Sequence, residues 1–205
     1  MALDITSKEI EQRCAAALKD IGFRTTSGTA YCPINETVLG WVGLNIAKHR
    51  DFVRINPNIG VHCVPVMRCM DSIRGKKYQP GRIATLAEPL GVIMPGERQI
   101  VMTDRTEIEP EIDRLMSYIV SDAKDRIAHL ADLSVLESAL HRRVPQFGGA
   151  PEMYALTLLL NGKTDEFTHF VSQQTVTVGQ LGEPGMLADW NDFKGKAQGC
   201  LLDLR

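Results

Sequence analysis

The chain has 205 residues, of which 44% are hydrophobic and 23% are charged, and its formal net charge is -2. These values are ordinary for a globular domain, and they exclude collagen-like, low-complexity and strongly disordered proteins. A chain of this length buries enough surface to fold without a disulfide or metal staple. We expect a single domain over residues 1–205, with a sub-boundary near residue 104 as the alternative.

The first predicted element is a helix over residues 7–21. Thr6 suits the N-cap position, and Glu9 stands three residues later, as a capping box requires. Gly22 suits the position just beyond the helix end. Between these signals, apolar residues recur at helical spacing: Ile10, Cys14, Ala17, Leu18 and Ile21.

Several predicted strands follow, separated by short turns. Short connections favour antiparallel pairing of neighbouring strands. A helix over 65–74, opened by Pro65, interrupts the series. In the strand 59–63, alternation directs Cys63 inward and His62 outward. The predicted strands are 29–34, 38–47, 52–55, 59–63, 83–87 and 99–102.

The C-terminal half reads as helical. Apolar residues from Ile112 to Leu130 recur with a period of about 3.6, which predicts a long amphipathic helix. Further helices are expected over 135–143, over 153–160 and from 164 onward, with a short helix after Glu183 anchored by Trp190 and Phe193. Strands before helices indicate an α+β fold: an antiparallel sheet of about five strands, an N-terminal helix and a helical C-terminal half.

The sequence also bears on location. The N-terminal residues lack the basic and apolar regions of a secretory signal, and no apolar run approaches the ~20 residues that span a bilayer. Five cysteines without a CxxC spacing fit free thiols in a reducing compartment. We therefore expect a cytoplasmic protein with no membrane association.

Three motifs invite a chemical interpretation, and each has a simpler one. Residues 161–164 read Asn-Gly-Lys-Thr, like the end of a phosphate-binding loop, but Thr157 replaces the first glycine, which favours a helix-hairpin turn. Adjacent strand residues point to opposite faces, so His62 is not placed to activate Cys63. A helical row of possible metal ligands is better explained as a solvated face: Asp122, Asp125, His129 and Asp132. We expect no catalytic residue, no cofactor and no metal.

The small net charge conceals an asymmetry. Residues 48–82 carry eight basic and two acidic residues, a net +6, whereas 83–139 carry five basic and eleven acidic residues, a net -6. The charges of the two stretches could pair with each other inside the fold or face solvent. Alternatively, the basic stretch could bind an acidic protein or a small anion. A pI of about 6.2 and the scarcity of interleaved aromatics argue against nucleic acid. The candidate residues are Arg50, Arg54, Arg68, Arg74, Lys76, Lys77 and Arg82.

Four segments together carry a family resemblance: a helix ending in Gly22-Phe23, a strand with Trp41 to Asn45, a strand with Asn58 to Val61, and a helix hairpin over 154–166. Over residues 7–172 the chain resembles a family of uncharacterised bacterial α+β proteins with a domain of unknown function. Some of its members are suspected immunity proteins of toxin systems. The resemblance implies a binding role without catalysis, and it transfers no functional residue.

These observations together favour a non-catalytic, cytosolic bacterial protein that binds a protein partner, such as an immunity-type inhibitor of a toxin. The alternative is an enzyme or sensor that binds an anionic small molecule or nucleotide through the basic residues of 48–82. The sequence indicates no oligomeric state.

Overall fold

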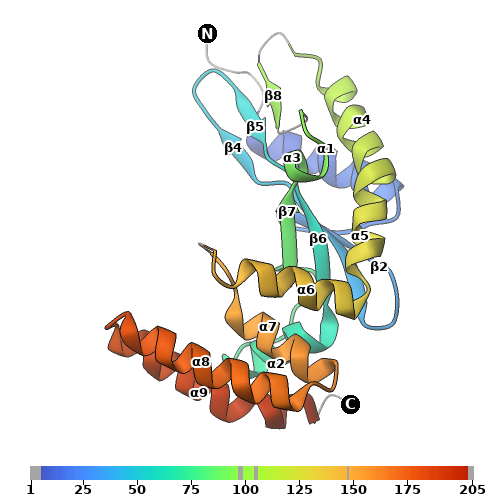
Figure 1. Ribbon diagram of the computed structural model, residues 1–205. Helices are drawn as coiled ribbons and strands as arrows, with labels where there is room; N and C mark the ends of the chain where they lie inside the picture. Colours follow the sequence, from blue (N-terminus) through green and yellow to red (C-terminus); the bar gives the residue numbers. More distant parts are fainter. Residues whose placement is uncertain (1–5, 97–98, 104–105, 147, 203–205) are drawn as a thin grey trace. The chain divides into compact units, whose positions relative to one another are not determined.

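The computed structural model describes residues 6–96, 99–103, 106–146 and 148–202. The chain divides into two compact units, whose elements are labelled in Figure 1. The sheet unit comprises residues up to 62 together with 80–131, and the helical unit comprises 63–79 together with 132 onward. The expectation of a single domain over residues 1–205 stays a prediction.

Helix α1, Ser7–Asp20, begins and ends where the sequence predicts. The Thr6 hydroxyl accepts a hydrogen bond from the Glu9 amide at 3.1 Å, which satisfies one of the free N–H groups of the first turn. Gly22 follows the helix at φ 94°, a conformation that glycine adopts without steric cost.

The larger sheet has five strands in the order β1-β2-β3-β6-β7. Neighbours β1 and β2, β2 and β3, and β6 and β7 pair in antiparallel fashion, with Tyr31 opposite Trp41. The α+β class with an antiparallel five-stranded sheet is therefore confirmed. The strands are β1 Arg24–Thr26, β2 Thr29–Pro33, β3 Val38–Gly43, β6 Asn58–Cys63 and β7 Leu86–Pro89.

A second sheet has three antiparallel strands in the order β4-β5-β8. It contains β4 Ile46–Lys48, β5 Val53–Ile55 and β8 Ile100–Met102. The prediction of one strand over 38–47 was wrong, because the chain leaves the larger sheet after Gly43 and enters the smaller one at Ile46. Asn45 lies at this bend with φ 46°, a left-handed conformation that asparagine tolerates better than most residues.

The predicted amphipathic helix of the sheet unit is present as a nearly continuous run. Its apolar stripe, including Ile112, Leu115, Ile119, Ile127 and Leu130, is buried. It consists of α4 Ile108–Tyr118, a π-helical turn η1 Ile119–Ala123 and α5 Lys124–Leu130. A short helix α3, Leu90–Ile93, was not predicted.

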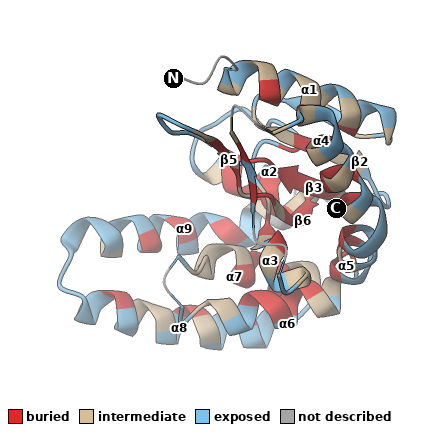
Figure 2. Cartoon of the chain, turned by 90° about the horizontal axis from the view of Figure 1, so that it is seen from above, coloured by how far each residue is buried: buried red, intermediate tan, exposed pale blue. Residues whose placement is uncertain are grey.

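The helical unit is built around α7, Pro151–Leu160, which contacts each of its other helices. Ala155, Leu156 and Leu158 have no exposed surface, as expected for a segment that is apolar nearly all round. In Figure 2, α8 and α9 carry buried residues at intervals among exposed ones. The surrounding helices are α2 Val64–Ile73, α6 Leu133–Arg143, α8 Thr164–Gln180 and α9 Pro184–Leu202.

The expectation of a short helix after Glu183 was wrong, because α9 has 19 residues. Three glycines lower the helix propensity of this segment. Burial of Trp190, Phe193 and Ala197 on one side of the helix outweighs that penalty. Both predicted anchors therefore belong to a longer element.

The outward orientation expected for His62 was also wrong. Strand β6 lies inside its sheet, and every residue from Ile59 to Cys63 is buried, so alternation does not separate an inner from an outer face. His62 is only 1% exposed and donates a hydrogen bond from Nδ1 to the carbonyl oxygen of Ile83 at 2.7 Å. This histidine is part of the core.

Gly60 should be intolerant of a side chain. A Cβ atom at this position would lie 1.9 Å from the carbonyl oxygen of Leu86 and 2.6 Å from the Cα of Ala87, both backbone atoms of β7. We expect Gly60→Ala to lower the free energy of unfolding by about 2 kcal/mol or more in urea denaturation. Gly179→Ala, where no atom lies within 4 Å, is the control and should leave stability unchanged or higher. Equal stability of the two variants would contradict the close approach of β6 and β7.

Candidate functional site

The seven predicted basic residues are divided between the two units. Arg50, Arg54 and Arg82 belong to the sheet unit, whereas Arg68, Arg74, Lys76 and Lys77 belong to the helical unit. All are exposed except Arg54, which is half-buried in β5 with its Nε atom lacking a hydrogen-bond partner among the described residues. Partner or anion binding by these residues stays a prediction.

Within each unit, the described residues of the two oppositely charged stretches form no ion pair with each other. Arg50 pairs weakly with its neighbour Asp51 at 3.9 Å, and the Arg68 guanidinium lies 5.2 Å from the ring centre of Tyr78. Internal pairing of the basic stretch with the acidic one is therefore not seen among the described residues of either unit.

The segment Asn161-Gly-Lys-Thr164 is a structural turn between α7 and α8. Glu137 of α6 holds it, because its carboxylate accepts a hydrogen bond from Asn161 Nδ2 at 2.6 Å and pairs with Lys163 Nζ at 2.8 Å. The hydrogen bond to Glu137 raises the pKa of Lys163. This lysine serves the helix hairpin, as the sequence predicts.

The row of possible metal ligands does not converge. Asp132 instead caps α6, since its carboxylate accepts hydrogen bonds from the amides of Ser134 and Val135 at 2.8 and 3.2 Å. Across the part of the chain that the structure describes, no group of three or more His, Cys, Asp or Glu side chains could hold a metal ion.

A hollow in the helical unit has a volume of about 1090 Å³. Its described lining comes from residues 144–146, 148, 149, 151 and 152, before and at the start of α7, and from the facing ends of α8 and α9. Leu181 and Met186, on either side of the α8–α9 turn, remain 59% and 49% exposed. The main apolar residues that line this hollow are Val144, Pro145, Val178, Leu181, Met186 and Trp190.

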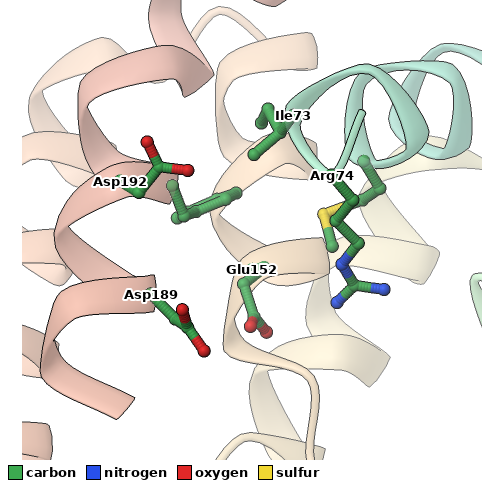
Figure 3. A pocket seen from close by; sticks show the side chains of 7 residues that line it. Ile73, Arg74, Glu152, Asp189 and Asp192 are labelled. Carbon is green, nitrogen blue, oxygen red and sulfur yellow. The ribbon is translucent and has the colours of Figure 1, made fainter. Parts of the chain in front are cut away.

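A second hollow of about 370 Å³ shares two acidic residues, Glu152 and Asp189, with the first. Figure 3 shows carboxylates from α7 and α9 around this opening, with Arg74 at the end of α2. Met70, Ile73 and Phe193 supply the apolar part of its lining. We call the two hollows together the groove of the helical unit.

Of the charged side chains that line the groove, some form ion pairs within the described residues and others do not. Asp192 forms an ion pair with Lys196 at 2.8 Å. Glu152 and Asp189 form no side-chain hydrogen bond or ion pair with another described residue, and neither does Arg74. The groove therefore places Glu152 and Asp189 beside an apolar surface without an ion-pair partner among the described residues.

Aromatic packing fixes the position of the apolar lining. Tyr154 and Phe170 meet edge to face at 4.7 Å between ring centres, and Phe170 and Trp190 at 6.5 Å. Trp190 also donates a hydrogen bond from Nε1 to the Thr175 hydroxyl at 3.1 Å. These contacts join α7, α8 and α9 and position Trp190, the residue of this set that lines the larger hollow.

Sequence reasoning missed four residues of this groove: Glu152, Asp189, Leu181 and Met186. The available signal was the presence of Leu181 and Met186 around Gly182, because large apolar residues at a helix-hairpin turn have little core to enter. The two carboxylates had no recognisable spacing. Arg74 is the one predicted basic residue that lines the groove within the described residues.

The comparisons with known proteins give no family for this chain. No family model matches it, and neither a curated protein nor a solved structure does. Of the helices that the structure describes, none combines the length and apolar character needed to cross a membrane.

The buried cysteines have raised pKa values. Burial raises the pKa of the Cys14 and Cys63 thiols to about 11, from an ordinary value of 9.0. Burial also raises the pKa of Cys69, with a further contribution from its hydrogen bond to the Cys200 thiol. A thiol that stays protonated at neutral pH is a poor nucleophile, so Cys63 is not activated as a thiolate.

Stability should fall at alkaline pH because of these thiols. Between pH 9 and 11 the unfolded chain releases thiol protons that the folded chain retains, which favours unfolding. We expect the free energy of unfolding to fall by about 2 kcal/mol for each of Cys14 and Cys63 over this range. Urea denaturation of the wild type and of a Cys14→Ala/Cys63→Ala variant measures the difference. Identical pH dependence of the two proteins would contradict the raised pKa values.

Proposed function

We propose that this protein is a non-catalytic binding protein that docks a protein partner on the groove of its helical unit. The single observation that carries the proposal is an apolar hollow of about 1090 Å³ flanked by the exposed side chains of Leu181 and Met186. Exposed apolar surface around a concave site is a recurrent property of protein-interaction surfaces.

The size and lining of the groove favour a protein over a small molecule. Ordinary small-molecule pockets have volumes of roughly 300–1,000 Å³ and enclose most of the ligand. Here the larger hollow reaches the upper end of that range, and a second hollow continues it. Such an arrangement suits several side chains of a partner rather than one enclosed ligand.

An immunity-type role is the specific form of this proposal. The resemblance of residues 7–172 to a family with suspected immunity proteins supports a toxin as the partner. Inhibitors of this kind act by covering an active site or a neighbouring surface, which needs binding strength rather than catalysis. A cytoplasmic location in a bacterium belongs to the same proposal.

Substitution at the α8–α9 turn tests the docking surface. We expect Leu181→Glu to weaken binding of the partner purified from the native host at least tenfold, because a charge would enter an apolar contact. Val176→Glu is the matched control: Val176 lies on α8, is 61% exposed and does not line the hollow. Its affinity should equal that of the wild type.

Affinity is measured by titration of each variant with the purified partner, and thermal unfolding confirms that both variants are folded. Equal binding by Leu181→Glu and the wild type would overturn the groove as the docking surface. Recovery of no protein partner by the wild type would overturn the binding function itself.

A further inference from the structure

We infer that the groove accepts a partner segment in which apolar side chains lie next to a lysine or arginine. The inference rests on the proposed docking function and adds the chemistry of the occupant. It begins from the two carboxylates, Glu152 and Asp189, that line both hollows.

The two carboxylates have no ion-pair partner among the described residues. Neither Glu152 nor Asp189 forms an ion pair or side-chain hydrogen bond with another described residue, although Lys196 is engaged with Asp192 nearby on α9. A carboxylate beside an apolar surface loses hydration when a partner covers it, and that cost is offset only by a cation or hydrogen-bond donor. A partner that brings such a group to the part of the groove away from Arg74 would offset this cost.

Apolar and acidic parts of the groove adjoin one another. Val178, Leu181 and Met186 line the larger hollow with Glu152 and Asp189, while Phe193 lies beside the same carboxylates in the smaller one. Lysine and arginine combine an apolar stem with a cationic head, so their side chains match this surface along their length. An acidic segment would instead place like charges together.

Arg74 sets a limit on the cation's position. It lines the smaller hollow, where Figure 3 shows Glu152 between Arg74 and Asp189, but it does not line the larger one. A lysine or arginine of the partner would be repelled near Arg74 and attracted where the two hollows meet. The apolar side chains of the segment then fill the larger hollow beside Leu181 and Met186.

The probe is a phage-displayed library of random peptides, selected on the folded full-length protein. Enriched peptides that do not bind Leu181→Glu define the groove-dependent set, and we expect them to combine lysine or arginine with apolar residues. Synthetic copies are then titrated by fluorescence anisotropy. Their affinity should fall at least fivefold on Glu152→Gln/Asp189→Asn and should decrease as salt is added.

Asp165→Asn is the control variant, because Asp165 carries the same charge on α8 and lines neither hollow. It should bind the peptides like the wild type. Groove-dependent peptides without basic residues, or with equal affinity for Glu152→Gln/Asp189→Asn, would overturn this inference and leave the docking function intact. If selection yields no peptide that depends on Leu181, both the inference and the proposed function are overturned.

Self-association is a separate outcome. If the free protein is a dimer by light scattering and Leu181→Glu makes it a monomer, the groove is occupied by a second copy of the chain. That result would overturn the inference, because the occupant would then be this chain and not a basic partner segment.

Discussion

Burial of α7 on all sides is the constraint on which the helical unit depends. A helix with almost no polar face has a large hydrophobic cost in water, and packing against α2, α6, α8 and α9 removes that cost. The polar residues at its C-terminal end are satisfied in the same arrangement, because Glu137 of α6 binds both Asn161 and Lys163. One apolar helix thus determines where its neighbours lie.

The groove lies where this packing stops, at the start of α7 and at the turn between α8 and α9. Pro151 and Glu152 lie in the first turn of α7, where the helix meets the 144–151 loop. Trp190 and Val178 close the other side, since α8 and α9 turn back on each other beyond them. The side chains at the turn between these helices extend past the core, which leaves Leu181 and Met186 exposed. The proposed docking surface would therefore take no packing from the core, because Leu181 and Met186 are not buried in it.

The sheet unit shows how close packing decides side-chain orientation. Gly60 permits β7 to approach β6 more closely than any side chain would allow. Both faces of β6 are consequently buried, and His62 is held by a backbone carbonyl rather than by solvent. Gly40 serves α5 similarly, since a Cβ atom there would lie 2.9 Å from Ile127. The buried His62 is therefore held by the backbone of its own unit.

The sequence by itself determined the fold class, the capped first helix, the amphipathic run ending at Leu130 and the burial of 154–159 within the predicted helix 153–160. Each depends on local periodicity or on capping residues, which neighbouring positions alone reveal. Tertiary structure decided the division of 38–47 between two sheets, the burial of His62 and the length of α9, because contacts distant in sequence outweighed local preference. It also decided the groove, where Glu152 and Asp189, 37 positions apart, line the same hollow. No local sequence pattern predicts that these two carboxylates line one hollow, because they come together only when α7 and α9 pack against each other.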